Sequence, residues 1–310
     1  MTNQSAAATG MDPGAGPVAP TRVDRPATLG WVMFDWAQQP FYTLVTTFLF
    51  APYFANVFIG DATRGQEIWG YASAAAGFVV ALTSPVLGAM ADATGRRKPY
   101  ILAFSLVLIV GSSLLWFAEP GMTERTWWII AAFIAATIAA EGSLVFINAM
   151  MPALGPPQAL GRISGLAWGV GYAGGLVALI LMAAFVVAAP ETGFTLLGLA
   201  PVVDLDIAAR EADRAVGPLS ALWYAVFVLP FFLLTVDRPT GAQPSVRTGL
   251  ADVAATVREI RRYRPIAIFL LARMFYIDGL LAIFAFGGIY GAATFNWQPI
   301  ELGVFGIVLA

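Results

Sequence analysis

Four ionisable residues lie inside long apolar runs of this 310-residue sequence. Glu141 lies about midway along one run, Arg273 and Asp278 lie in another, and Asp35 lies near the start of a third. A charge near the centre of a bilayer costs at least about 2.5 to 3.5 kcal/mol on insertion scales, so such groups are usually paired, hydrated or functional. The chain contains no His, which leaves carboxylates as its proton carriers. We therefore expect proton or solute binding at these positions.

A structural ion pair is the alternative role for each carboxylate, with Arg273 as the partner. Arg273 and Asp278 are five residues apart, which is about 140° around a helix, so they are poorly placed to satisfy one another. At about 1.5 Å of rise per residue, Asp278 falls close to the membrane midplane. Both roles remain open for Glu141 and Asp278.

The role of Asp35 depends on Pro40. Proline is harmless at the first position of a helix, and a helix that begins there would leave Asp35 at the membrane interface. If the helix begins near Trp31 instead, Pro40 kinks it beside Gln38 and Gln39. In that case Asp35, Gln38 and Gln39 form a polar patch that lines the solute pathway.

Composition places the chain in a membrane. Hydrophobic residues make up 59% of it, charged residues 12%, and the mean hydropathy is +0.75. A soluble domain could not bury so much apolar side chain, whereas a bilayer accepts it. A net charge of -2 gives no basic surface for nucleic acid. The partners we expect are the lipid bilayer, a small-molecule solute and protons.

Missing residue types exclude several chemistries. Without Cys or His the chain has no disulfide and no Cys/His metal site, so we predict no metal and no cofactor. The only lysine, Lys98, follows Arg97 and precedes Pro99, which rules out a Walker-type phosphate loop and nucleotide binding.

The elements that position these groups are apolar runs long enough to cross a bilayer core of about 30 Å. We call them spans one to seven: Trp31–Ile59, Ile68–Ala91, Tyr100–Ala118, Trp127–Met151, Ser164–Ala189, Leu219–Val236 and Pro265–Phe295. Twelve Lys and Arg residues fall in the N-terminal tail and the loops after spans two, four and six, against four in the alternate loops. By the positive-inside rule the N-terminus is cytoplasmic, and we expect a protein of the bacterial plasma membrane.

The domain organisation follows from these spans. We predict a disordered tail over residues 1–28, a six-helix bundle over 29–236, a basic cytoplasmic linker over 237–264 and part of a second bundle over 265–310. In the loop between Pro190 and Pro218 we expect a short surface helix with compensating charges.

Small residues mark two helix-packing faces. Span two has a stripe at alternating steps of four and three, which contains Gly77, and span five has two G-x-x-x-G pairs around Gly165, Gly169, Gly171, Gly174 and Gly175. Small residues let another helix backbone approach closely in a membrane. Static packing and sliding faces that move during transport both fit this pattern.

The loop between spans two and three has the sequence Gly88-x-x-x-Asp92-x-x-Gly95-Arg96-Arg97. Asp92 can pair with a helix N-terminus or an arginine, Gly95 permits a tight reversal, and the cations suit an anionic headgroup region. The loop therefore acts either as a latch on the inner gate or as a plain topology anchor.

This loop matches the signature of the major facilitator superfamily between its second and third helices. Other segments resemble the vacuole-effluxer branch, whose founding members release amino acids from fungal vacuoles. They are Asp35-Trp36-Ala37, Asn148-Ala149 before Pro152, Gly169-x-Gly171-Tyr172-x-Gly174-Gly175 and Tyr276-x-Asp278-Gly279. The chain departs from the branch at Gln38-Gln39-Pro40, where a small Asn-Ser type stretch is usual, and this leaves the solute open.

The resemblance implies an all-α membrane bundle, a gate role for Asp92 and a place for Asn148 in the solute pathway. It implies secondary transport of a small polar solute, with amino acids as one class, by alternating access. The alternatives are a membrane enzyme that uses Asp35 and Asp278 as an aspartate pair, or a sensor that binds solute without moving it. An eighth apolar run begins at Glu301 and stops at Ala310, so we expect a longer native chain of about twelve helices.

Overall fold

The computed structural model describes residues 20–187, 192–195, 197–237 and 262–295, together with 251, 254–255 and 258–259. The side chains of residues 92–94, 281–282 and 284–295 are outside this description. Within the described residues the fold is all-α, as predicted, and six helical stretches are long and apolar enough to cross a membrane. The protein is therefore an integral membrane protein. The predicted eighth span, residues 301–310, lies outside the described residues.

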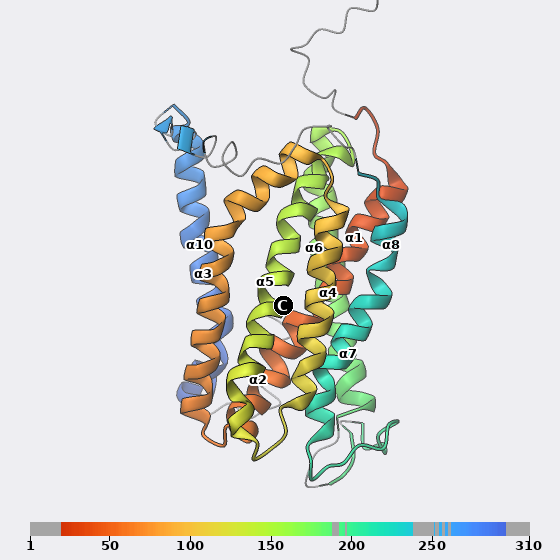
Figure 1. The fold of residues 1–310 in the computed structure, drawn as a ribbon, viewed down its shortest axis with the longest axis vertical. Coiled ribbons are helices and arrows are strands. Elements are labelled where there is room, and N and C mark those ends of the chain that lie inside the picture. The colour runs from red at the N-terminus through yellow and green to blue at the C-terminus, as the bar shows by residue number, and fades with distance from the viewer. Residues whose placement is uncertain are drawn as a thin grey trace, which may run out of the picture. The chain divides into compact units, whose positions relative to one another are not determined.

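The helical elements follow the predicted spans closely (Figure 1). The first span combines α1 (Arg25–Pro40), the π-helical η1 (Phe41–Phe48), α2 (Phe50–Tyr53) and η2 (Phe54–Phe58). The others are α3 (Ala62–Thr94), α4 (Lys98–Leu114), α5 (Thr126–Met150), α6 (Pro157–Phe185), α7 (Glu211–Phe227) with α8 (Leu229–Leu234), and α10 (Arg264–Phe295). Short 3₁₀ turns at Leu115–Phe117, Thr123–Arg125 and Met151–Ala153 extend α4 and α5.

The first helix begins earlier than expected. Residues 25–28 were predicted to belong to a disordered tail, but α1 starts at Arg25 and runs without interruption to Pro40. Asp24 Oδ1 accepts a hydrogen bond from the Ala27 amide at 3.1 Å, and Pro26 occupies the first turn, where its missing N–H is harmless. The helix therefore does not begin at Pro40, and Asp35, Gln38 and Gln39 lie within it.

The chain divides into two compact units. Unit 1 comprises residues 1–84 and 94–241, and unit 2 comprises residues 85–93 and 242–310. The first boundary falls inside α3 at Pro85, which has no N–H for the carbonyl of Ala81 and so weakens the helix there. Unit 2 contains the rest of α3 and all of α10, the helix of Arg273 and Asp278.

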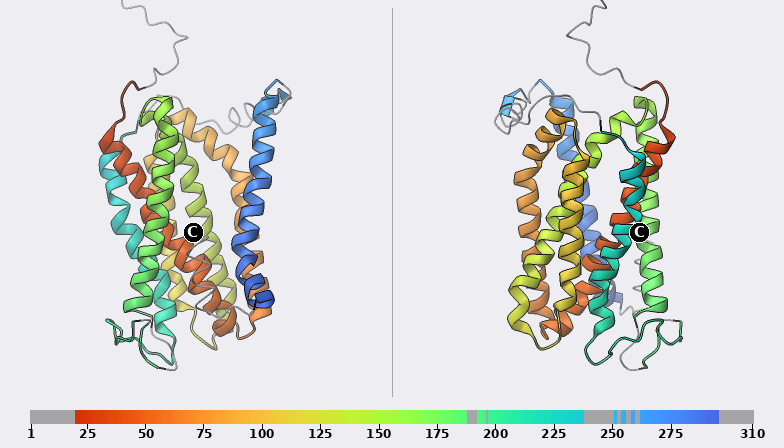
Figure 2. Two further views of the ribbon diagram at one scale, coloured as in Figure 1. Left: turned by 180° about the vertical axis from the view of Figure 1, so that it is seen from behind. Right: turned by 45° about the vertical axis from the view of Figure 1, so that its right-hand side comes forward.

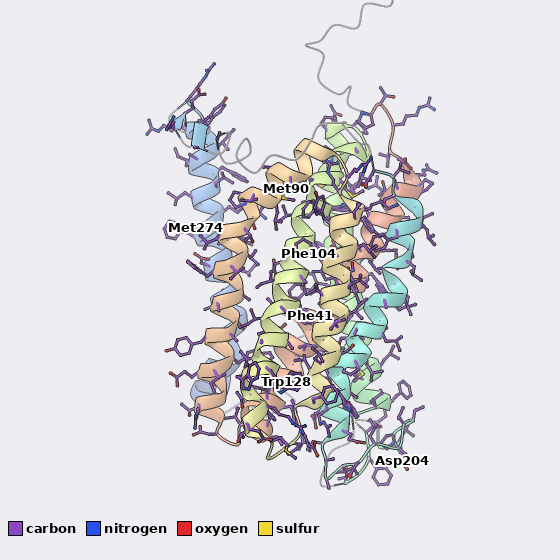
Figure 3. The ribbon with its side chains drawn as sticks, viewed as in Figure 1. Phe41, Met90, Phe104, Trp128, Asp204 and Met274 are labelled. Carbon is purple, nitrogen blue, oxygen red and sulfur yellow. The ribbon has the colours of Figure 1, made fainter. Side chains whose placement is uncertain are left out.

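Unit 1 is built around α1. This helix packs against α6 along one side and against α7 and α8 along another, while α4 packs against α5 and α7 (Figures 1 and 2). Phe34 is fully buried, with its ring centroid 6.0 Å from Tyr224 and 5.4 Å from Phe231. Where α4 packs on α5, a Cβ added at Gly142 would lie 2.9 Å from the ring of Phe104, so the glycine permits this close approach; Figure 3 labels Phe104 on α4.

The sixth span corrects one sequence expectation. The prediction of a short surface helix between Pro190 and Pro218 is wrong. The helix in this region is α7, which begins at Glu211 and continues through Pro218 to Phe227. Arg214 is only 6% exposed, and its Nε donates to the Trp116 carbonyl at 2.8 Å while the guanidinium lies 4.7 Å from the Trp116 ring centroid. The carbonyl and the ring stabilise the buried cation, so this charged turn belongs to the spanning helix.

Candidate functional site

The candidate site is a polar network between α1 and α5. Gln38 is 2% exposed, and its Nε2 donates to the Ala140 carbonyl at 2.8 Å and to the Tyr42 hydroxyl at 3.2 Å. Tyr42 in turn donates to Glu141 Oε1 at 2.9 Å. Gln38 on α1 and Tyr42 on η1 are four residues apart in the first span, and Ala140 and Glu141 are adjacent on α5. The structure thus brings together two residues that the sequence singled out, Gln38 and Glu141.

The amide of Gln38 has a defined orientation. The Ala140 carbonyl can only accept a hydrogen bond, so the group facing it must be the NH₂ of the amide. Gln38 Oε1 is buried and accepts no hydrogen bond from the described residues. An acceptor left in this position is costly unless a donor reaches it.

Asp35 and Gln39 lie on a different side of α1, against α6. A Cβ added at Gly171 would lie 3.1 Å from Asp35 Cβ, and one added at Gly175 would lie 2.9 Å from Gln39 Cγ. Asp35, Gln39 and Thr43 follow one another at steps of four, so they form one stripe along the helix. Glycines on α6 let this polar stripe lie close to the neighbouring backbone.

Pro40 frees a backbone carbonyl that makes a further polar contact. Proline has no N–H, so the carbonyl of Trp36, four residues earlier, loses its partner within the helix. The indole Nε1 of Trp223 on α7 donates to this carbonyl at 3.2 Å, and the two indole rings stack with centroids 5.7 Å apart. A Cβ at Gly174 would lie 2.8 Å from the same carbonyl oxygen. The carbonyl oxygen of Trp36 thus loses a helical donor because of Pro40, accepts from Trp223, and has room only because residue 174 is glycine.

The predicted packing glycines fall into two groups. Gly171, Gly174 and Gly175 face α1, where an added Cβ would meet its atoms at 3.1 Å or less. At Gly77, Gly165 and Gly169 an added Cβ meets no described atom within 4 Å. Any packing role for these three remains a prediction.

The loop with the signature spacing is held by residues from the sixth span. Gly95 has φ +61, the left-handed conformation that ends α3, and α4 begins three residues later at Lys98. The carboxylate of Asp237, just beyond α8, accepts from the amides of Arg97 at 3.1 Å and Lys98 at 3.1 Å and 3.2 Å. Asp237 therefore caps the N-terminus of α4 from about 140 residues away.

Lys98 makes the reciprocal contact. Its Nζ donates to the carbonyls of Phe232 and Thr235 at 2.7 Å each, at the C-terminal end of α8. The Asp237 carboxylate lies at the N-terminus of α4 and the Lys98 ammonium at the C-terminal end of α8. Both charges interact favourably with the dipoles of these helices. Within the motif, Gly88 and Asp92 lie on α3 and Arg96 and Arg97 lie in the loop, while the Asp92 side chain is outside the described residues.

Comparison with known proteins identifies the family. A model of the family described as "Vacuole effluxer Atg22 like" matches residues 67–310. The chain belongs to this family. It is 26% identical over 267 residues to the uncharacterized MFS-type transporter YxiO of Bacillus subtilis (strain 168), a match that covers 84% of this chain and 59% of YxiO. It is 24% identical over 160 residues to Autophagy-related protein 22-2 of Aspergillus clavatus, which covers 47% of this chain and 23% of that relative. The chain thus spans less than two thirds of either relative.

Segments by which the sequence resembled the Atg22-like family meet in the structure. Asp35-Trp36 on α1 contacts Gly171 and Gly174 on α6, although the two segments are far apart in the chain. Asn148 lies on α5 in its last turn and is exposed, away from the Gln38–Tyr42–Glu141 network. Arg273 and Asp278 lie on α10 in unit 2.

Three residues of the site were missed by the sequence analysis. Tyr42 could have been found from its spacing of four from Gln38, and Trp223 from the need to satisfy a carbonyl freed by Pro40. Asp237 gave no local signal beyond being the acidic residue after the sixth span. Among the described residues no group of three or more carboxylates could hold a metal ion.

Proposed function

We propose that this Atg22-like chain forms the first half, and the start of the second half, of a secondary transporter for a small polar solute. The supporting observation is the Gln38–Tyr42–Glu141 network, which places a carboxylate and an unpaired amide oxygen inside apolar spanning helices. Polar groups inside spanning helices are costly to bury and commonly mark a substrate or ion pathway. The family is described as a vacuole effluxer and the relative YxiO is named an MFS-type transporter, which also favours transport over enzymatic chemistry.

The proposed solute has at least one N–H donor, with amino acids as the first class to test. Gln38 Oε1 would accept from that donor, and Glu141 would attract a cationic group or exchange a proton with the solvent. In the complete fold Asp278 would contribute the corresponding carboxylate of the second half, with Arg273, since solute sites of such transporters lie near the midplane between the repeats.

Alternating access and proton coupling complete the proposal. Residues 29–236 would form one six-helix bundle, 237–264 the linker and 265–310 the start of the other bundle, in a bacterial plasma membrane with the N-terminus cytoplasmic. The signature loop with Asp92 would favour one state of the inner gate, and Asp35, Gln39 and Asn148 would line the pathway. The close glycine contacts of α1 with α6 would let these helices move as one body.

The decisive experiment is flux in proteoliposomes. Purified full-length protein is screened with radiolabelled amino acids and small polar metabolites, with and without a pH gradient. We expect uptake of at least one solute that the gradient stimulates, and loss of that stimulation in Glu141→Gln and Asp278→Asn. Glu67→Gln, at an exposed position near the start of α3, is the matched control. Binding of a solute without flux would instead indicate a sensor, and flux unchanged in both variants would remove the carboxylates from the mechanism.

A further inference from the structure

The loop between α6 and α7 has a surface that the transport proposal does not use. It runs from the end of α6 at Phe185 to the start of α7 at Glu211, at the end of unit 1 where α6 ends and α7 begins (Figures 1 and 3). Because it joins two membrane-crossing helices, this loop must lie at a membrane boundary.

Charge is segregated along the loop. Residues 192–203 have the sequence TGFTLLGLAPVV and contain no charged side chain, whereas Asp204, Asp206, Arg210, Glu211 and Asp213 follow within ten residues. We call the described residues 194–195 and 197–203 the apolar arm and residues 204–213 the charged arm. An uncharged arm beside a charged arm is the arrangement of a segment that lies in the plane of a membrane interface.

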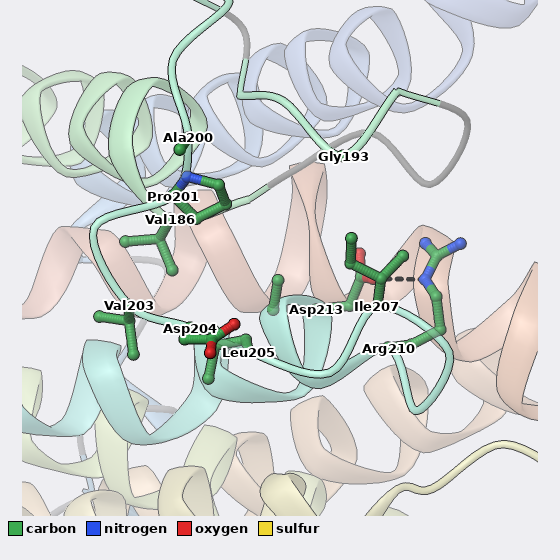
Figure 4. A pocket seen from close by; sticks show the side chains of 11 residues that line it. Val186, Gly193, Ala200, Pro201, Val203, Asp204, Leu205, Ile207, Arg210 and Asp213 are labelled. Atoms are coloured by element: carbon green, nitrogen blue, oxygen red, sulfur yellow. Dashed lines mark hydrogen bonds and ion pairs between the residues drawn. The ribbon is translucent and has the colours of Figure 1, made fainter.

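The apolar arm exposes its side chains. Val202 is 75% exposed, Leu197 59% and Phe194 51%, which is unusual for neighbouring large apolar residues. They are not needed to fill the interior of the loop. A cavity of about 270 Å³ inside it is lined by other residues, among them Val186, Pro201, Val203 and Arg210 (Figure 4).

The apolar arm continues the apolar surface of α6. The Val202 amide donates to the Phe185 carbonyl at 2.9 Å, which fixes the arm to the last turn of the helix. Ile180, Leu181 and Phe185 in the last two turns of α6 are also exposed. These side chains belong to a membrane-spanning helix, so the arm extends an apolar surface that begins within the span.

The charged arm makes hydrogen bonds within itself and with the first turn of α7. Asp206 Oδ1 accepts from the amides of Ala208 at 2.8 Å and Ala209 at 3.1 Å, and Arg210 Nε donates to Asp213 at 2.6 Å. These contacts satisfy the charges locally at the start of the helix.

We propose that the apolar arm inserts into the bilayer interface, with Phe194, Leu197 and Val202 among the acyl chains next to the headgroups. The occupant of this surface is membrane lipid. The arm anchors the joint between the fifth and sixth spans to one leaflet, while the charged arm stays in the aqueous headgroup layer. Apolar burial drives such insertion.

These 310 residues contain no cysteine, and any cysteine elsewhere in the full protein is replaced by serine for the test. Single-cysteine variants Leu197→Cys and Val202→Cys are spin-labelled in the full protein in phosphatidylcholine nanodiscs. Relaxation is then measured with oxygen, which concentrates in the acyl region, and with a water-soluble nickel chelate. We expect oxygen to dominate at both positions. Ala208→Cys, an exposed position on the charged arm, is the matched control, and there we expect the chelate to dominate.

Two outcomes would overturn the proposal. If Leu197 and Val202 respond to the nickel chelate as Ala208 does, the arm lies in water. If both labels are inaccessible to oxygen and to the chelate, protein covers the arm, either another part of the chain or a second copy. Size-exclusion chromatography and circular dichroism of each labelled variant establish that it is folded, so either result is decisive.

Discussion

Tyr42 on the first span donates its hydroxyl hydrogen to Glu141 on the fourth span at 2.9 Å. The same hydroxyl accepts from Gln38, so one phenol joins an amide and a carboxylate that belong to different helices. Hydrogen bonds to a carboxylate are stronger than those between neutral groups. Tyr42 is therefore the residue through which a change at Glu141 would be transmitted to Gln38.

Tyr42→Phe should impair transport without unfolding the protein. The substitution keeps the ring and removes one hydroxyl, so packing is retained while Glu141 loses a donor worth about 1.5 to 3 kcal/mol. We expect solute flux to fall about tenfold or more, because 1.4 kcal/mol corresponds to a factor of ten. Flux by Tyr42→Phe and Glu141→Gln, alone and combined, is the measurement. If their effects add, the two side chains act independently and the network has no joint role.

Two glycine-to-alanine substitutions on α6 should change the stability of the protein in opposite directions. At Gly174 the new Cβ would lie 2.8 Å from the Trp36 carbonyl oxygen, so the backbones must separate at a cost of about 1 to 3 kcal/mol. At Gly169 it would meet no described atom within 4 Å, and alanine in a helix interior is favoured over glycine by about 0.5 to 1 kcal/mol. Thermal unfolding in detergent should show Gly174→Ala below the native protein and Gly169→Ala at or above it. The reverse order would mean that α6 packs through its other face.

The sequence predicted that both glycine pairs pack against a helix, but it did not show which pair does so in the structure. The two G-x-x-x-G pairs of span five look equivalent in sequence, yet they are six residues apart and so lie about 120° apart around the helix. Spacing shows that the members of each pair share a face, but not which face meets the first span. The neighbour of a helix depends on the fold of the whole bundle, and a single sequence does not encode it locally.

The spans themselves were predictable because their signal is local. Apolar runs of sufficient length must be helical in lipid, since every backbone group needs a partner within its own segment. The contacts of Gln38 with Ala140, and of Asp237 with Lys98, join residues 102 and 139 positions apart. Such pairs have no periodic signal. The start of α7 was missed for a related reason, because Arg214 looks solvent-exposed until its contact with Trp116 is seen.

Asp237→Ala should destabilise the loop that carries the signature spacing. The carboxylate caps two amides at the start of α4, and loss of an N-terminal cap costs about 0.5 to 2 kcal/mol. Asp237→Asn keeps a side-chain oxygen in the same place, so we expect a smaller loss. The measurement is thermal stability in detergent together with protease cleavage near Arg96 and Arg97. Equal stability of the alanine variant and the native protein would show that the cap is dispensable.

Trp223→Phe should be destabilising because of Pro40. The indole N–H satisfies the Trp36 carbonyl that Pro40 leaves without a helical partner, and a buried acceptor without a donor costs about 1 to 3 kcal/mol. Phenylalanine retains aromatic contact with Trp36 and lacks the donor. The single variant should therefore unfold at a lower temperature than the native protein.

The same argument predicts that Pro40→Ala reduces the cost of Trp223→Phe. Alanine at position 40 restores an N–H that can bond to the Trp36 carbonyl within the helix, so the indole donor is no longer essential. In a double-mutant cycle the two substitutions should couple by about 1 kcal/mol, with the double variant more stable than the sum of the single effects implies. Thermal or denaturant unfolding of the four proteins in detergent gives the coupling. A coupling of zero would mean that Trp223 acts through ring stacking, with centroids 5.7 Å apart, and that water or another group satisfies the carbonyl.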